Sequence, residues 1–173
     1  MAHLVFITGG ARSGKSAFAQ QRAEAHCGPL LYVATAEVRD DEMRQRVEKH
    51  QKARGDHWQS LEEPLDLATA IAEKVLPGTT VLIDCLTLWL SNLLEKYGED
   101  EAAILAAADG LLAALDQLDI TVYLVSNEVG SGIVPENRLA RSFRDLAGLF
   151  NQKFAAAADE AYLVVAGLPL QLK

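Results

Sequence analysis

An octapeptide near the start of the chain carries residue types that bind nucleotide phosphates. It follows the apolar run 4–7 and reads Gly9-Gly10-Ala11-Arg12-Ser13-Gly14-Lys15-Ser16, a complete G-x-x-x-x-G-K-S pattern. Glycines let such a loop curl with its backbone N–H groups inward, while the lysine reaches the β- and γ-phosphates and the serine hydroxyl can ligate Mg²⁺. Residues 17–24 favour the helix that must follow this loop. We therefore predict a nucleoside triphosphate site, with Lys15 as a catalytic cation and Ser16 as a metal ligand.

A second oxygen donor, Asp84, ends an apolar run about 70 residues after the loop. An acidic residue at the end of such a strand holds Mg²⁺ in P-loop enzymes. The alternative is an aspartate that caps the following helix, with residues 85–87 as the turn. No guanine-selective N-K-x-D motif follows the run 120–125, so we do not expect a switch-type GTPase. By position alone, Asp84 and Glu128 are the candidates for a general base.

The segment 40–54 begins with acidic and ends with basic residues, as the helix dipole favours. On such a helix Arg46, His50 and Arg54 lie at i, i+4 and i+8, along one face. A phosphate chain can bind along this cationic stripe, and cations around an imidazole keep it neutral and nucleophilic. The alternative is a solvated charged helix with an incidental histidine.

Length and composition limit the class of protein. A chain of 173 residues, half of them apolar, fits one domain over 1–173. The net charge of −8 argues against nonspecific binding of nucleic acid. No apolar stretch reaches the roughly 20 residues that span a bilayer, and no secretory signal precedes the first strand, so we expect a cytoplasmic protein. Cys27 and Cys85 form no C-x-x-C pair, and we expect both to be reduced, buried thiols. The remaining histidines, at positions 3, 26 and 57, are interpreted as structural.

Short apolar runs alternate with segments of helical spacing. This alternation predicts an α/β fold with a mostly parallel sheet and helices on both faces. The expected strands are 4–7, 30–34, 80–84, 120–125 and 161–165, with 168–172 as an edge strand that tolerates proline. The expected helices are 17–24, 65–76, 101–118 and one from Pro135 to about 158. The last carries an apolar stripe, read as core or subunit interface, at Leu139, Phe143, Leu146, Phe150 and Phe154.

Together these motifs resemble one family, the bifunctional adenosylcobinamide kinase/adenosylcobinamide-phosphate guanylyltransferases of cobalamin assembly. The resemblance spans nearly the whole chain. The matching segments, in order, are 9–16; 32–36; 41–43 with Arg46, His50, Arg54 and Trp58; 84–87 with Asn92; and 127–130 with 132–138. Some relatives carry two adjacent histidines where this chain has Lys49-His50, and the flanking Arg46, Arg54 and Trp58 align the family's nucleophile with His50.

The resemblance implies a RecA-like P-loop fold, a homotrimer and two successive reactions on one corrinoid substrate. In the first, ATP or GTP phosphorylates the hydroxyl of the aminopropanol arm of adenosylcobinamide. In the second, GTP donates GMP to that phosphate, which yields adenosyl-GDP-cobinamide and pyrophosphate. The resemblance also implies Mg²⁺ and a covalent guanylyl intermediate on His50. Outside the P-loop, the nucleotide contacts that it implies fall on Ala34, Thr35, Ala36, Gln51, Lys52, Ala53, Arg54, Glu62 and Asp84.

Two other functions are compatible with the P-loop alone. In a simple small-molecule kinase, Arg46, His50 and Arg54 would only bind phosphate, and no covalent adduct would form. A regulatory nucleotide-binding module would bind ATP or GTP without transfer to a corrinoid. Neither alternative explains why the segment 127–138 also matches the family.

Overall fold

The computed structural model describes residues 1–36 and 55–173, whose strands form one seven-stranded sheet. The strands lie in the order β3-β2-β4-β5-β1-β6-β7, and every neighbouring pair is parallel except β6 and β7. Their bounds are β1 (His3–Gly9), β2 (Leu30–Ala34), β3 (Trp58–Glu62), β4 (Thr80–Asp84), β5 (Thr121–Asn127), β6 (Glu160–Val165) and β7 (Leu168–Gln171). We call the end at which the parallel strands finish the carboxyl end of the sheet, and the opposite end the amino end. The prediction of a mostly parallel α/β sheet is confirmed.

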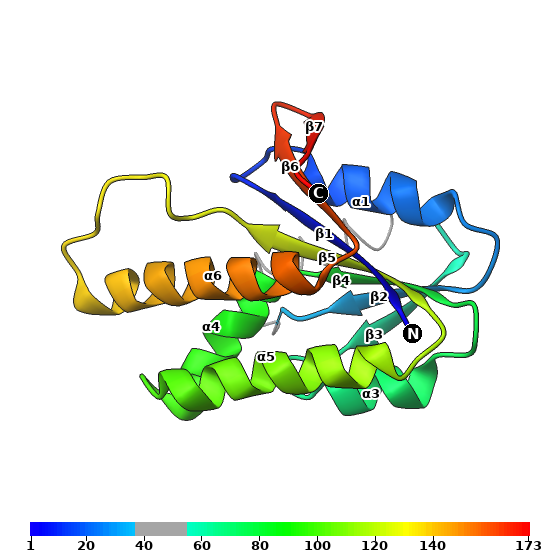
Figure 1. Cartoon of the computed structure of the whole chain (residues 1–173), viewed down its shortest axis with the longest axis horizontal. Coiled ribbons are helices and arrows are strands. Elements are labelled where there is room, and N and C mark those ends of the chain that lie inside the picture. The colour runs from blue at the N-terminus through cyan, green and yellow to red at the C-terminus, as the bar shows by residue number, and fades with distance from the viewer. Residues whose placement is uncertain (37–54) are drawn as a thin grey trace.

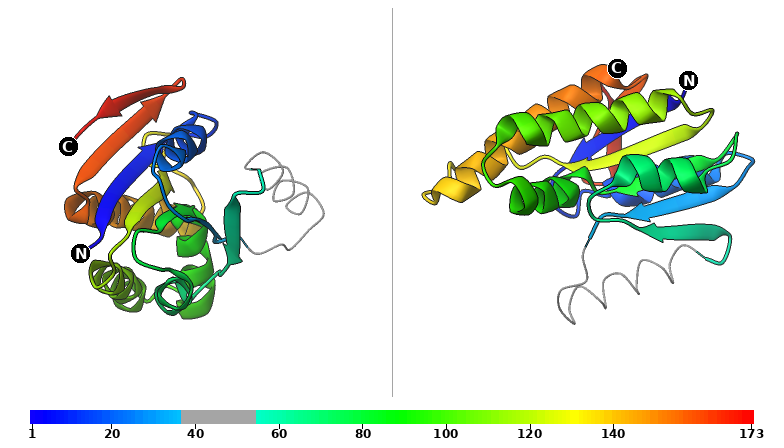
Figure 2. Two further views of the ribbon diagram at one scale, coloured as in Figure 1. Left: turned by 90° about the vertical axis from the view of Figure 1, so that its right-hand side faces the viewer. Right: turned by 90° about the horizontal axis from the view of Figure 1, so that it is seen from below.

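Both faces of the sheet are covered (Figures 1 and 2). Helix α1 (Lys15–Glu24) packs on one face, and the other face carries α3 (Leu67–Lys74), α4 (Leu86–Tyr97), α5 (Glu101–Asp116) and α6 (Arg138–Ala157). Successive side chains of a strand point to opposite faces. In β1, Leu4 and Phe6 accordingly join the four-helix core, while Val5 and Ile7 join the core under α1.

Two elements depart from the expectations. Strand β3 is absent from the predicted strands because its sequence, Trp58-Gln59-Ser60-Leu61-Glu62, is mostly polar and its side chains are largely exposed on an edge strand. Helix α4 is absent from the predicted helices; it begins at Leu86, within the turn 85–87 of the alternative in which Asp84 caps a helix, and buries Trp89, Leu90 and Leu93 against the core. The expectation of a buried Cys27 is wrong, because this residue is exposed in the connection between α1 and β2.

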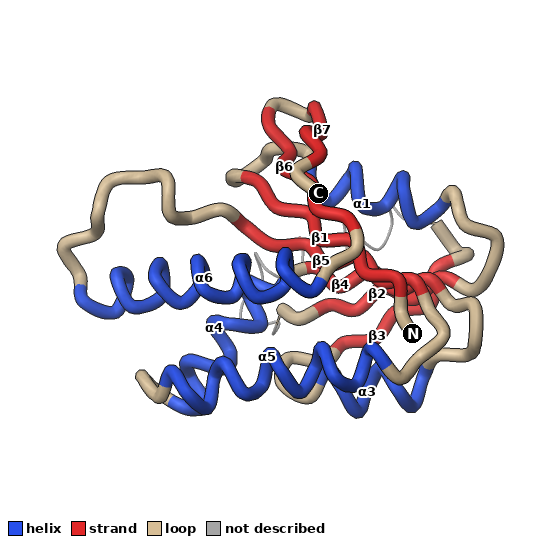
Figure 3. The backbone as a smooth tube through the Cα atoms, viewed as in Figure 1, coloured by secondary structure: helices blue, strands red, loops and turns tan. Residues whose placement is uncertain are grey.

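The apolar stripe of helix α6 has a buried part and an exposed part. Leu146, Phe150 and Phe154 are buried in the core, whereas Phe143 is half-buried and Leu139 is 59% exposed. The exposed part adjoins the long connection 128–137, which has no helix or strand (Figure 3). Within the described residues, no helix is long and apolar enough to cross a membrane.

Candidate functional site

The P-loop joins the carboxyl end of β1 to the first turn of α1, the strand-loop-helix arrangement that its sequence predicts. Gly9 has no room for a side chain, because a Cβ atom would lie 2.5 Å from the Val164 carbonyl oxygen and 2.6 Å from Ser13 Oγ. Gly14 has a φ of +95° and caps α1. Arg12 also has a positive φ, of 54°, which costs about 1 to 2 kcal/mol for a residue with a side chain. The loop is therefore held in a strained shape by its surroundings.

Part of that support comes from the C-terminal hairpin. The turn between β6 and β7 places Ala166 and Gly167 at φ values of 52° and 82°, a geometry that suits a tight two-residue hairpin. The Gly167 N–H donates to the Ser13 carbonyl oxygen at 2.7 Å. Residues about 150 positions apart in the chain thus hold the phosphate loop in place.

Polar groups of the P-loop face inward with few partners. Lys15 is only 8% exposed, and its ammonium donates to the Gly10 carbonyl oxygen at 3.1 Å. The hydroxyls of Thr8 and Ser13 are buried and make no hydrogen bond within the described part of the chain. Buried polar atoms are nearly always paired, and exceptions such as these two hydroxyls are expected mainly at functional or strained sites.

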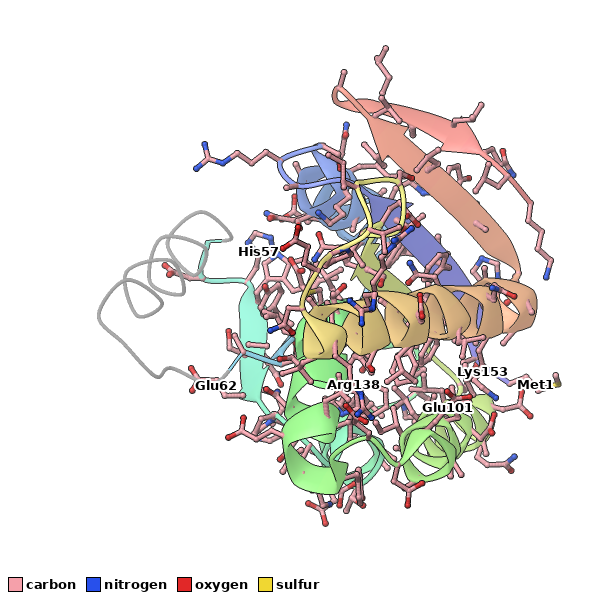
Figure 4. The ribbon with its side chains drawn as sticks, turned by 90° about the vertical axis from the view of Figure 1, so that its left-hand side faces the viewer. Met1, His57, Glu62, Glu101, Arg138 and Lys153 are labelled. Carbon is pink, nitrogen blue, oxygen red and sulfur yellow. The ribbon has the colours of Figure 1, made fainter. Side chains whose placement is uncertain are left out.

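The sheet register aligns the other predicted contacts with the P-loop. Ala34 pairs with both Glu62 and Asp84, Asp84 pairs with Val125, and Val125 pairs with Ile7. Neighbouring strands lie about 4.8 Å apart, so the backbones of Asp84 and β1 are about 10 Å apart, with β5 between them. Figure 4 looks onto this end of the sheet and shows Glu62 to one side of it. Ligands of open parallel sheets bind outside the carboxyl ends of the strands, which is where these residues lie.

Asp84 is held in place by a buried polar framework. Thr35 Oγ1 donates to the Cys85 carbonyl oxygen at 2.7 Å and accepts from the Cys85 N–H at 3.0 Å. The Asn92 side-chain amide donates to the Thr35 carbonyl oxygen at 2.8 Å. Because the Thr35 side chain is fully buried in these bonds, it positions the residue next to Asp84. A contact between Thr35 and a nucleotide stays a prediction.

A second framework of polar side chains surrounds the carboxyl end of β5, and the sequence did not predict it. Thr87 Oγ1 accepts from the Asn127 N–H at 2.7 Å, and Ser126 Oγ donates to Asn151 at 2.6 Å. Asn151 in turn donates to the Asn127 carbonyl oxygen at 3.1 Å. These bonds connect α4 and α6 to the strand that pairs with Gly9. The one signal for them in the sequence is the change from apolar to polar residues where β5 ends.

Asp84 and Ser16 provide the hard oxygen atoms that Mg²⁺ prefers. The Asp84 carboxylate makes no hydrogen bond or ion pair with any other residue that the structure describes. The described residues contain no group of three His, Cys, Asp or Glu side chains that could hold a metal. Mg²⁺ usually binds one or two protein ligands together with substrate phosphates, so these two oxygens fit a metal that binds with a nucleotide.

The neighbouring Cys85 is unsuited to nucleophilic chemistry. Burial, and after it the adjacent Asp84, raises the pKa of its thiol to about 11. A thiolate is the reactive form of cysteine, so Cys85 is inert near neutral pH.

The remaining predicted residues lie outside the described part of the chain. They are Arg46, His50, Gln51, Lys52, Ala53 and Arg54. The described chain reaches this segment at Ala36, directly after Thr35, whose N–H lies 3.5 Å from the Asp84 carbonyl oxygen. The described chain before the gap therefore ends one residue after Thr35, which lies beside Asp84.

Comparisons with known proteins agree on the family and the fold. The family described as cobinamide kinase / cobinamide phosphate guanyltransferase matches residues 5–172. The bifunctional adenosylcobalamin biosynthesis protein CobU of Escherichia coli is 44% identical, over 98% of this chain and 99% of its own. The corresponding protein CobP of Pseudomonas aeruginosa is 42% identical, over 96% of this chain and 95% of its own.

Two solved structures share the fold at low sequence identity. A KaiC-like protein of Pyrococcus horikoshii is 15% identical with a TM-score of 0.50, over 93% of this chain and 70% of its own. An ATPase of a bacterial type III secretion system is 11% identical with a TM-score of 0.58, over 98% of this chain and 56% of its own. Both have RecA-like P-loop cores, so the predicted fold class is confirmed.

Proposed function

The chain belongs to the family of cobinamide kinases / cobinamide phosphate guanyltransferases, and from that premise we propose that one P-loop site serves both reactions on adenosylcobinamide. ATP or GTP first phosphorylates the aminopropanol hydroxyl, and GTP then donates GMP to the new phosphate. The observation that supports one shared site is the alignment of the P-loop, Ala34, Asp84 and Glu62 along the carboxyl end of the sheet.

Phosphoryl transfer depends mainly on positioning and on stabilising the charge of the phosphates. The inward N–H groups of the P-loop and the Lys15 ammonium bind the β- and γ-phosphates. Ser16 and Asp84 would hold Mg²⁺, which offsets phosphate charge when it is bound. The acceptor hydroxyl attacks the γ-phosphorus while the bond from that phosphorus to the bridging oxygen breaks; the nucleoside diphosphate leaves, and the hydroxyl proton passes to a carboxylate base, for which Asp84 and Glu128 are the candidates.

Guanylyl transfer proceeds in two displacements. A neutral His50 imidazole attacks the α-phosphorus of GTP, a P–N bond forms, and pyrophosphate leaves as the P–O bond breaks. A phosphate oxygen of adenosylcobinamide phosphate then attacks the same phosphorus, and the P–N bond breaks to return the imidazole. Support for His50 comes from its place in the motif, where Arg46, Arg54 and Trp58 align it with the family's nucleophile.

We also propose that the protein works in the cytoplasm as a homotrimer. The apolar side chains of edge strand β7 and the residue after it support self-association, because Leu168, Leu170 and Leu172 are each more than half exposed. Monomeric proteins rarely expose apolar patches of this kind.

The covalent intermediate provides the test. The full chain is incubated with Mg²⁺ and GTP without corrinoid, and intact mass and peptide mapping locate any acid-labile GMP adduct. We expect the adduct on His50 in the native chain and in His57→Ala, a control that removes an exposed histidine just before β3, and none in His50→Ala. His50→Ala should still phosphorylate cobinamide. Guanylyl transfer by His50→Ala would disprove the assignment of His50 as the nucleophile. If the native chain phosphorylated cobinamide but formed no adduct, the simple small-molecule kinase would be favoured.

A further inference from the structure

An apolar pocket of about 750 Å³ lies between α4 and the start of α6. Its walls include Leu94 of α4, Val129 of the connection 128–137, and Leu139 and Phe143 of α6. The polar side chains that line it are Ser91, Glu95, Asn137 and Arg144. Its volume is typical of small-molecule sites, which combine an apolar lining with a few polar groups.

The pocket wall formed by the connection is well supported. Arg144 donates to the Gly130 carbonyl oxygen at 2.9 Å, and Arg141 donates to the Pro135 carbonyl oxygen at 3.0 Å. The Glu128 carboxylate accepts from the Gly130 N–H at 2.6 Å. The connection is thus bound to α6 at both ends, and the shape of the pocket does not depend on a free loop.

Two walls of the pocket belong to segments that begin next to the P-loop and next to Asp84. The Glu128 N–H donates to the carbonyl oxygen of Gly9, the first P-loop residue, at 3.0 Å, and Val129 of the pocket wall follows Glu128. Helix α4, which forms the opposite wall, starts two residues after Asp84. Figure 4 shows Arg138, the first residue of α6, on the same end of the molecule as the P-loop.

We propose that this pocket binds one edge of the corrinoid acceptor and directs its aminopropanol arm toward the P-loop. The inference rests on the proposed function and names the acceptor subsite of that site. A corrin macrocycle has apolar faces, methyl substituents and amide arms at its rim. The apolar walls suit the macrocycle, and the side chains of Ser91, Asn137 and Arg144 are hydrogen-bond donors for amide carbonyl groups.

Charge favours the corrinoid over a second copy of the chain as the occupant. Arg144 lines the pocket together with one carboxylate, Glu95, and both Arg144 and the nearby Arg141 bind neutral carbonyl groups, so neither guanidinium is neutralised by those bonds. The acceptor of the second reaction carries a phosphate, whose negative charge these guanidinium groups attract. A second copy would bring the same arginines to an apposed α6.

Equilibrium dialysis of the full chain with adenosylcobinamide, measured by its visible absorbance, tests the pocket. Leu139→Glu places a charge in the pocket at a position already 59% exposed, so the fold should tolerate it. Ser91→Trp fills the pocket from α4, also at an exposed position. We expect each variant to weaken cobinamide binding by about tenfold or more and to leave GTP binding within about twofold.

Leu76→Glu is the matched control, because Leu76 is 66% exposed and lies at the amino end of the sheet. It should bind cobinamide as the native chain does. If both pocket variants bound the corrinoid with native affinity, the proposal that the pocket binds it would be overturned, and the proposed function would stand. A changed molecular mass of Leu139→Glu by light scattering, together with weakened binding, would also overturn it and assign the pocket to an interface between copies. Failure of the native chain to bind or phosphorylate cobinamide would instead overturn the proposed function, and the pocket with it.

Discussion

At the amino end of the sheet, the Glu160 carboxylate binds three other side chains, whereas at the carboxyl end the Asp84 carboxylate binds none within the described residues. Glu160 accepts from Arg22 at 3.0 Å and from the Tyr162 hydroxyl, and His3 Nε2 lies 3.1 Å from it. The guanidinium of Arg22 also lies over the Tyr162 ring, 5.2 Å from its centre.

The carboxyl end has the opposite character. Thr8 and Ser13 have unpaired hydroxyls in the described structure, Lys15 binds only a loop carbonyl, and Arg12 has a strained backbone. Polar groups that bind one another stabilise the fold, whereas polar groups without partners cost stability and are retained where they bind a ligand. The difference indicates that the amino end serves stability and the carboxyl end serves function, and four predictions test this division.

The largest effect is expected for Lys15→Ala. Removal of a cation that stabilises charge in the transition state costs about 10² to 10³ in rate, so both the kinase and the guanylyl transfer rates should fall at least about 100-fold. The thermal midpoint should stay close to the native value, because within residues 1–36 and 55–173 the buried ammonium makes a single hydrogen bond, to Gly10. Steady-state assays and thermal unfolding measure the two effects, and a large loss of stability with retained activity would contradict the division.

Thr35→Val tests whether the paired framework at the carboxyl end supports function. The substitution keeps the shape but leaves the Cys85 N–H without its partner, which should lower the free energy of unfolding by about 1 to 3 kcal/mol. Because Cys85 follows Asp84, the apparent Mg²⁺ requirement of cobinamide phosphorylation should also rise. Thr35→Ser should restore both the Mg²⁺ requirement and the stability. If the valine variant lost stability but kept its native Mg²⁺ dependence, Thr35 would be structural only.

Glu160→Gln tests the amino end. It weakens the bonds to Arg22 and Tyr162, and we expect a loss of about 1 to 2 kcal/mol in the free energy of unfolding in urea. Activity per folded molecule should stay native. A drop in that activity with unchanged stability would show that the two ends are not separate in function.

The smallest effect is a dependence of stability on pH. The hydrogen bond from Tyr162, and then those from His3 and Arg22, lower the pKa of Glu160 to about 2, although burial opposes the shift. A carboxyl group with a depressed pKa stabilises the fold fully above its ordinary pKa of 4.5, and this contribution is lost as the pH falls toward 2. The stability difference between the native chain and Glu160→Gln should therefore be constant above about pH 5 and shrink below it. Urea titrations at pH 7, 4 and 3 would measure it, and a constant difference down to pH 3 would contradict the prediction.

Much of the fold was predictable from local pattern. The core strands β1, β2, β4, β5 and β6 are continuous apolar runs, because both of their faces are buried, and such runs are visible in the sequence. Strand β3 was not predictable, because an exposed edge strand carries no apolar run. Helix α4 was not predictable because its apolar residues directly follow the apolar run of β4, and no turn residue or spacing marks where the strand ends and the helix begins.

The site was predictable only in part. The P-loop motif contains its own strand, turn and helix signals, so residues 9–16 were found directly. Asp84 is predictable from its place at the end of an apolar run. Of the residues that hold it, Thr35 lies about 50 residues earlier in the chain, and Asn92 lies nearly two turns into α4. No local pattern connects them. The predicted roles of His50 and of residues 51–54 remain predictions.

The sequence by itself determined the phosphate loop, the α/β alternation and the order of the motifs, because these depend on residues close together in the chain. Only the tertiary structure decided that Glu62, Ala34 and Asp84 align at the carboxyl end of the sheet, with β5 between Asp84 and β1, since register between strands is set by packing of the whole sheet. It also decided that Gly167 supports the P-loop and that α4 and α6 enclose an apolar pocket. Contacts between distant segments exist only once the core has brought those segments together.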